Sequence, residues 1–153
     1  SSCADTITVC LSKGLGCPIG SLLAGPSDLM AEAWSVRTRL GGGMRQVGII
    51  AAAGLWALDH NLDRLDEDHE RARRLALGSD SLDGLRAEVP DTNIVMIHLE
   101  REDLDEETMA SELEACGVLV LPAGPGRLRA VTHLDVDDGG VDRCLEVLSR
   151  LLA

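Results

Sequence analysis

Apolar and polar residues alternate at the start of the chain, and the period then changes to that of a helix. Residues 6–11 (TITVCL) place an apolar residue at every second position, which is typical of a strand with two different faces. A second apolar run at 19–25 predicts another strand. Pro26-Ser27-Asp28 is a helix-start signal, and Leu29, Ala33, Val36 and Leu40 follow it at helical spacing, so a helix is predicted over 29–40.

Two further helices of opposite character are predicted after a glycine triplet at 41–43. Residues 44–58 are apolar nearly all round, with alanine and glycine at 51–54. Small residues permit close helix packing, so we expect this helix inside the protein or at a subunit contact. Residues 62–77 are amphipathic and heavily charged, and they predict a helix that connects two domains.

The second half of the chain has a simple order of predicted elements. Residues 79–88 are polar and contain glycine, which indicates a joint leading into a smaller domain. A strand, a helix, two strands and a closing helix then follow, an order that favours an α+β sandwich with helices on one face of a small sheet. These elements are expected, in order, at 92–99, 104–116, 118–121, 128–134 and 141–152.

The composition argues against nucleic acid and membrane as partners. The net charge is −12, whereas nucleic-acid binding relies on basic patches that release counterions from phosphate. The chain has two tryptophans and no Phe or Tyr, so no aromatic cluster is available to stack bases. The longest apolar stretch, 47–58, is well short of the ~20 residues that would span a bilayer. We therefore expect a cytoplasmic protein.

The cysteines and histidines predict neither a disulfide framework nor a metal site. The five cysteines are odd in number, scattered, and without a C-x-x-C pair. We expect them to be reduced thiols. The four histidines show no spacing typical of metal ligands, so no metal is predicted.

One lysine, Lys13, stands among thirteen arginines. Arginine does not deprotonate in a protein, whereas a lysine amine can lose its proton and attack a carbonyl to form a Schiff base. Lys13 follows the first predicted strand and precedes Gly14 and Gly16, whose turn can expose backbone amides to an anionic group. No third glycine completes a dinucleotide fingerprint. Composition alone explains Lys13 equally well as a chance survivor of biased codon usage, but the flanking residues favour chemistry.

Three segments resemble the threonine aldolases, pyridoxal-phosphate enzymes of the aspartate-aminotransferase fold. The first is 5–21 (DTITVCLSKGLGCPIGS), which is similar to the segment that carries the family's cofactor lysine. The second is 40–48 (LGGGMRQVG), a glycine-rich Met-Arg-Gln motif, and the third is 129–136 (RAVTHLDV), a C-terminal strand motif. The three motifs occur in the family's order over nearly the whole chain.

The resemblance implies an α/β chain that forms the C-terminal part of a fold type I enzyme. The end of the large, cofactor-binding domain and the connecting helix would occupy 1–78, and a small α+β domain would occupy 79–153. In the family the lysine segment lies past the middle of the chain, so we expect a fragment that is inactive alone. The start at Ser1, without an initiator methionine or signal peptide, is consistent with that expectation.

The resemblance also implies roles for five residues. Lys13 would carry pyridoxal 5′-phosphate, and Ser12 and the Gly14 amide would help to position that cofactor. Arg45 would lie near the cofactor phosphate of a neighbouring subunit, although an interface salt bridge is nearly as good an explanation. Arg129 would bind the substrate α-carboxylate by two parallel hydrogen bonds. A surface arginine is the alternative explanation of Arg129.

The implied reaction is cleavage of threonine or allo-threonine to glycine and acetaldehyde, by an aldehyde-lyase of threonine catabolism and glycine biosynthesis. The enzyme would be a homodimer or homotetramer with an amino acid as substrate. Two alternatives stay open: another β-hydroxy-amino-acid aldolase or β-eliminating lyase, or a non-catalytic remnant that dimerises through 44–58. We expect His133 to take part in a hydrogen-bond network with its neighbours, because the family's catalytic histidine belongs to the absent part.

Overall fold

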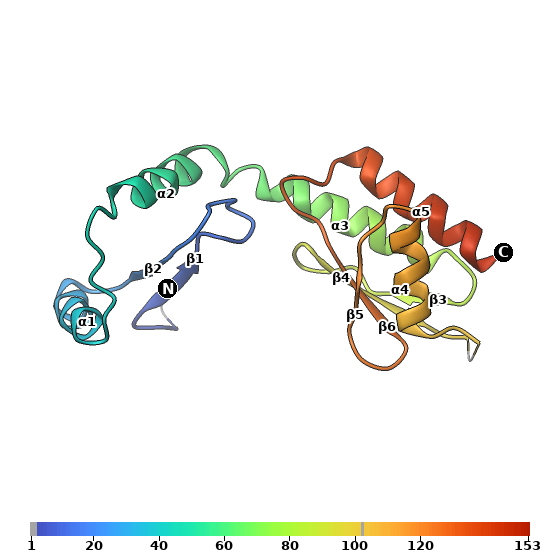
Figure 1. Ribbon diagram of the computed structural model, residues 1–153, viewed down its shortest axis with the longest axis horizontal. Helices are drawn as coiled ribbons and strands as arrows, with labels where there is room; N and C mark the ends of the chain where they lie inside the picture. Colours follow the sequence, from blue (N-terminus) through green and yellow to red (C-terminus); the bar gives the residue numbers. More distant parts are fainter. Residues whose placement is uncertain (1–2, 102) are drawn as a thin grey trace. The chain divides into compact units, whose positions relative to one another are not determined.

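A computed structural model describes residues 3–101 and 103–153 and divides the chain into two compact units (Figure 1). The first unit ends at Leu65 and the second begins at Asp66. The first contains β1 (Ile7–Cys10), β2 (Ser21–Ala24), α1 (Ser27–Arg39) and α2 (Gly48–His60). The second contains nearly all of α3 (Leu65–Asp80), then β3 (Leu85–Ala87), β4 (Ile94–Leu99), α4 (Glu106–Ala115), β5 (Leu121–Pro122), β6 (Arg127–Val131) and α5 (Asp138–Leu152). The division into a large domain at 1–78 and a small domain at 79–153 stays a prediction.

The first unit has a small core and an exposed two-stranded sheet. Strands β1 and β2 pair antiparallel, with Ile7 opposite Ala24 and Cys10 opposite Ser21, and every residue of both strands is exposed. The core lies beyond the strands, where the segment after β1 packs on the C-terminal half of α2. Its buried members are Leu11, Leu15, Cys17 and Ala57, and Leu58 and Leu65 pack against them.

The second unit is an antiparallel sheet of four strands in the order β3-β4-β6-β5, with α3, α4 and α5 on one face (Figure 1). Paired residues such as Ile97 and Leu128 point to the same face and are buried with apolar residues of all three helices. The predicted α+β sandwich is therefore confirmed. The opposite face carries the alternate residues, including Arg129, which is half-buried.

A small polar network joins the start of α3 to the sheet of the second unit. Thr132, almost fully buried after β6, donates from Oγ1 to the carbonyl oxygen of Asp68 at 2.6 Å. Asn93 Nδ2 donates to the Thr132 carbonyl oxygen at 2.7 Å, and the Thr132 amide donates to the Asn93 carbonyl oxygen at 3.0 Å. These bonds satisfy polar groups whose burial would otherwise be costly.

Two predicted elements were wrong in kind or in their limits. Residues 79–88 are not only a joint, because they contain β3, in which Leu85 and Ala87 are buried and Arg86 is exposed. Helix α2 begins at Gly48 rather than at Met44. Residues 45–47 form a turn in which Gln46 has a φ of 52°, a conformation that a helix does not accommodate.

The remaining limits differ by a few residues. Strand β5 lies at Leu121–Pro122 instead of 118–121, and β6 ends at Val131 instead of Leu134. The Thr132 amide still donates to the Asn93 carbonyl oxygen, in register with the β4–β6 pairs, and the pairing ends there. None of the helices in the described ranges combines the length and the apolar character that crossing a bilayer requires.

Candidate functional site

Lys13 lies in a loop, residues 11–20, that connects β1 to β2 and is closed by backbone hydrogen bonds. The Leu11 amide donates to the Gly20 carbonyl oxygen at 2.9 Å, and the Cys17 amide donates to the Leu11 carbonyl oxygen at 3.0 Å. Within the loop, the Gly16 amide donates to the Lys13 carbonyl oxygen at 2.8 Å. Gly16 has a φ of 72°, in the left-handed region that favours glycine. The sequence thus forms the tight turn that was predicted.

The lysine loop, residues 11–20, packs against α2 and is hydrogen-bonded to it. Asn61, at the end of α2, donates from Nδ2 to the Leu15 carbonyl oxygen at 2.8 Å. Cys17 Sγ donates to the Ala53 carbonyl oxygen at 3.6 Å. A Cβ at Gly54 would lie 3.1 Å from Leu11 Cδ1, so this glycine allows the helix and the loop to pack closely.

The lysine side chain and two neighbouring amides are available to a ligand. Lys13 is exposed, and its amine has no hydrogen bond or ion pair with the part of the chain that the structure describes. The backbone N–H groups of Lys13 and Gly14 likewise donate to no acceptor among those residues. A Cβ at Gly14 would lie 2.7 Å from Leu65 Cδ2, so a side chain at this position would require the end of the Leu65 side chain to move. A free amine beside unpaired amides fits an anionic ligand that carries a carbonyl group.

Ser12 lies beside Cys10 in this structure. Cys10 Sγ is 3.4 Å from Ser12 Oγ, and both residues are exposed. Hydrogen bonds from the Ser12 hydroxyl and amide, aided by the charge of Lys13, lower the pKa of the Cys10 thiol below its ordinary value. Ser12 directly precedes Lys13, and its hydroxyl lies near Cys10. A contact between this hydroxyl and a cofactor stays a prediction.

Arg45 lies in the turn before α2 and does not begin the helix, contrary to the sequence prediction. Its side chain is exposed, and the guanidinium has no partner within residues 3–101 and 103–153. The guanidinium could therefore bind an anion or an acidic side chain.

Arg129 belongs to the second unit, whereas the other candidate residues belong to the first. It lies on β6 between Met96 of β4 and Leu121 of β5, on the sheet face away from the helices. Leu128 and Ala130, which alternate with Arg129 along the strand, are buried on the other face. Arg129 is half-buried, and its guanidinium has no partner in the described part of the chain, a state that suits capture of a carboxylate.

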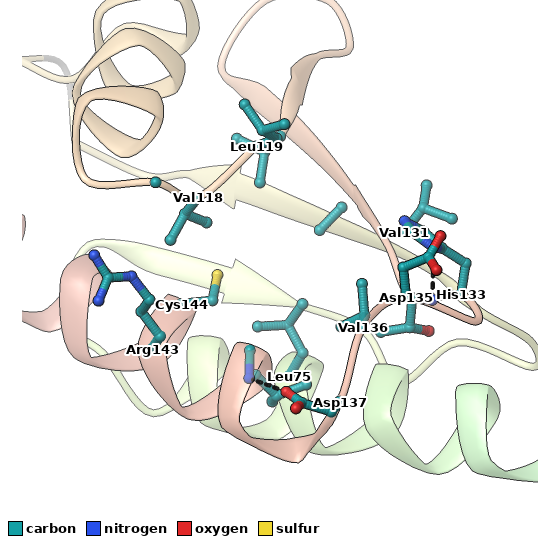
Figure 2. Close-up of a pocket in the computed structure, with 16 residues that line it drawn as sticks. Leu75, Val118, Leu119, Val131, His133, Asp135, Val136, Asp137, Arg143 and Cys144 are labelled. Carbon is teal, nitrogen blue, oxygen red and sulfur yellow. Dashed lines mark hydrogen bonds and ion pairs between the residues drawn. The ribbon is translucent and has the colours of Figure 1, made fainter.

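A cavity of about 350 Å³ lies in the second unit beside the end of β6 (Figure 2). At its rim, the Asp135 amide donates to His133 Nδ1 at 3.3 Å, and Asp135 Oδ2 is 3.7 Å from the same nitrogen. The predicted hydrogen-bond network of His133 is thus confirmed. Figure 2 also shows Asp137, which accepts a hydrogen bond from the Gly140 amide at the start of α5.

Asn61 and Cys17 were not identified from the sequence as contacts of the lysine loop. Asn61 follows a predicted helix, where asparagine is common for purely local reasons. Its partner is 46 positions away, and no periodicity or motif marks a contact over that separation. Cys10, Cys17, Cys116 and Cys144 are in no disulfide in the described part of the chain. No group of three potential metal-ligating side chains is present in the described ranges.

The chain is similar in sequence to a family model and to longer proteins of known name. The family model for beta-eliminating lyases matches residues 1–102. Low-specificity L-threonine aldolase 1 of Arabidopsis thaliana is 38% identical over 152 residues, which cover 97% of this chain and 42% of that protein. The low specificity L-threonine aldolase of Escherichia coli (strain K12) is 44% identical over 134 residues, which cover 86% of this chain and 38% of that protein. The chain therefore spans about two fifths of the length of these relatives.

Solved structures confirm the predicted fold class. Serine palmitoyltransferase of Sphingomonas wittichii superposes with a TM-score of 0.74 at 19% identity, over 96% of this chain and 39% of that chain. Aspartate aminotransferase of Rhizobium meliloti gives a TM-score of 0.65 at 19% identity, over 95% of this chain and 41% of that chain. The chain has the fold of part of an aspartate-aminotransferase-like, fold type I protein.

Proposed function

Because the chain belongs to the beta-eliminating lyase family, we propose that it is the lysine-bearing part of a pyridoxal-phosphate-dependent lyase. The proposed substrate is threonine or allo-threonine, cleaved to glycine and acetaldehyde. Two relatives named low-specificity L-threonine aldolase support an aldolase that acts on threonine. The observation that carries the proposal is Lys13, an exposed, unpaired amine at a closed turn inside the matched region. The enzyme would act in the cytoplasm as a homodimer or homotetramer.

Lys13 would hold pyridoxal 5′-phosphate covalently through its amine. When bound, that cofactor accepts the electrons released as the Cα–Cβ bond of an amino acid breaks. The unpaired amides of Lys13 and Gly14 would support its position, and the Ser12 hydroxyl lies two residues from Gly14 at the same turn. The short, closed turn would keep the backbone that carries Lys13 in a fixed place, so that less orientational freedom is lost on attachment.

Arg45 and Arg129 are proposed as anion-binding groups. Arg129 would form two parallel hydrogen bonds to the α-carboxylate of the substrate, which a lysine could not do with the same geometry. Arg45 would approach the cofactor phosphate of a neighbouring subunit. Replacing either arginine by lysine keeps the charge but loses the planar fork, so the two substitutions separate charge from geometry.

The direct experiment is reductive trapping of pyridoxal phosphate on the chain. The protein would be mixed with the cofactor, reduced with borohydride and mapped by peptide mass spectrometry. We expect a stoichiometric adduct on Lys13, and none in Lys13→Ala or Lys13→Arg. The N-terminal amine is the chain's one other aliphatic amine and provides an internal measure of non-specific reaction. A folded chain that labels only at that terminus would contradict the proposal.

The remnant hypothesis is the second candidate, and the apolar exposure of the first unit supports it. Both strands of the β1–β2 pair are exposed throughout, and Leu55 and Trp56 of α2 are largely exposed. A remnant would associate through this surface without binding the cofactor. Trapping at Lys13 therefore separates the two candidates, and threonine cleavage after a relative's N-terminal part is supplied tests the reaction itself.

A further inference from the structure

We infer that Asn61 is a positioning residue of the lysine loop. Its side-chain amide attaches the turn that bears Lys13 to the C-terminal end of α2. This inference rests on the proposed function only in taking the Lys13 amine as the reactive group. Asn61 would act on Lys13 through the backbone of Leu15, which its side chain contacts.

The contact is short, buried and between distant parts of the chain. Asn61 Nδ2 lies 2.8 Å from the Leu15 carbonyl oxygen, and Asn61 is only 5% exposed. The backbone N–H of Asn61 also donates to the Ala57 carbonyl oxygen at 2.8 Å, which anchors the residue as the C-terminal cap of α2. The helix end therefore fixes the donor, and the donor fixes the loop.

Leu15 is the part of the loop where such a bond has most effect on Lys13. It lies inside the turn that the Gly16 amide closes on the Lys13 carbonyl oxygen at 2.8 Å. The leucine side chain is buried in the cluster with Ala57 and Leu58, but the hydrophobic effect has no preferred direction. A hydrogen bond has a preferred direction, so it restricts the loop in a way that packing does not.

The other polar link between the loop and α2 is weaker. Cys17 Sγ lies 3.6 Å from the Ala53 carbonyl oxygen, and a thiol is a poor donor. Cys17 also follows the turn, whereas Leu15 lies within it. In the described part of the chain, the Asn61 bond is thus the strong directional contact between α2 and the turn.

Asn61→Asp tests this contact with almost no change of shape. The substitution replaces the Nδ2 donor by a carboxylate oxygen, which would face the Leu15 carbonyl oxygen and repel it. A buried carbonyl left without a donor is costly, so the loop would move to find water. Asn61→Leu removes the same donor without adding charge, and it serves if Asn61→Asp does not fold.

Asn93 offers a matched control in the second unit. Its Nδ2 donates to the Thr132 carbonyl oxygen at 2.7 Å, across 39 positions, so it makes the same kind of bond at nearly the same distance. Asn93→Asp should disturb the second unit to a similar degree and leave the lysine loop unchanged.

Two measurements on the full chain would follow the loop. The first is hydrogen exchange at the amides of Leu11, Gly16 and Cys17, whose bonds close it. We expect about tenfold faster exchange in the Asn61 variants and no change in Asn93→Asp. The second is the NMR signal of Lys13 after reductive methylation with ¹³C-formaldehyde, which reports one lysine because the chain has one. This signal should shift in the Asn61 variants while amides of α2 stay protected.

The inference is overturned if the three amides exchange as slowly in both Asn61 variants as in the unsubstituted chain, or if Asn93→Asp accelerates them equally. Free exchange of these amides in the unsubstituted chain would overturn it as well. Neither measurement involves pyridoxal phosphate. A chain that keeps its loop but fails to trap the cofactor would therefore contradict the proposed function and leave the role of Asn61 intact.

Discussion

Cys144 connects the core of the second unit to the pH dependence of its stability. Its thiol lies among apolar residues of α5, and this burial raises its pKa to about 11 from an ordinary value of 9.0. Between these two values the unfolded chain releases the thiol proton while the folded chain keeps it. The unfolded state is thereby favoured as pH rises, and stability is fully present only below pH 9.

We expect the free energy of unfolding of the second unit to fall by about 2–3 kcal/mol between pH 8 and pH 11 through this thiol. Urea unfolding followed by circular dichroism at several pH values would measure the fall. Cys144→Ala removes the titrating group, so this part of the pH dependence should disappear in the variant. An unchanged pH dependence would show that the Cys144 thiol is not the cause.

Individual side chains differed in how far the sequence could predict them. The faces of β6 follow from alternation, because a strand sends neighbouring side chains to opposite sides: Leu128 and Ala130 are buried, and Arg129 lies on the other face. Lys13 was identified from composition and its glycines. Asn61 was not, because its function depends on a carbonyl group 46 residues away, and backbone groups carry no sequence signal.

The N-terminus of α5 depends on one side chain, Asp137. Its carboxylate accepts a hydrogen bond from the Gly140 amide at 2.8 Å, and Gly139 and Gly140 follow in the first turn. Glycine is a poor helix former, so this turn relies on its cap more than an alanine-rich turn would.

We expect Asp137→Ala to destabilise the second unit by about 1 kcal/mol, whereas Asp137→Asn, which can also accept the bond, should cost much less. Urea unfolding of the two variants would give both values. Equal losses in the two variants would show that the negative charge near the helix start, rather than the hydrogen bond, stabilises the end of α5.

The elements that the sequence failed to predict are those with the fewest residues to form a pattern. Strand β3 has three residues, so the alternation of Leu85, Arg86 and Ala87 was too short to recognise against a polar background. The start of α2 was placed too early because Met44 and Val47 are apolar, like the helix that follows. Their turn depends on the backbone conformation of Gln46, which hydrophobic periodicity does not report.

Helix α2 exposes an apolar surface that predicts self-association. The helix is apolar nearly all round, yet only part of it is covered. Ile49 is 83% exposed and Leu55 is 66% exposed. From the sequence, this helix was expected either inside the protein or at a subunit contact. Because its apolar side chains are exposed on the first unit, the subunit contact is the alternative that we predict. Contiguous apolar surface of this kind favours association in water.

We expect the chain to associate with increasing concentration and Ile49→Glu to weaken that association at least tenfold, because a buried unpaired carboxylate is costly. Leu119→Glu is the matched control, since Leu119 is 79% exposed but belongs to the second unit. Sedimentation velocity over a range of concentrations would measure both variants. An equal effect of the two substitutions would mean that α2 is not the contact.

The two units differ in core size, which predicts that they unfold separately. In the described ranges, the main cluster of the second unit holds sixteen buried residues and that of the first holds four. Both tryptophans, Trp34 and Trp56, belong to the first unit, and the chain has no Phe or Tyr. Tryptophan fluorescence therefore reports the first unit alone, whereas circular dichroism reports helices of both.

In urea we expect the fluorescence transition at a lower concentration than the main transition by circular dichroism, because the first unit has the smaller core. A single two-state transition of the whole chain would make the two curves coincide. Leu113→Ala, which removes a fully buried side chain of the second unit, should cost about 2–5 kcal/mol and shift only the circular-dichroism transition. Coincident curves that shift together in this variant would show one cooperative structure. Separate curves would mean that the lysine loop belongs to the less stable unit, which then needs a further covering segment to hold Lys13 rigidly.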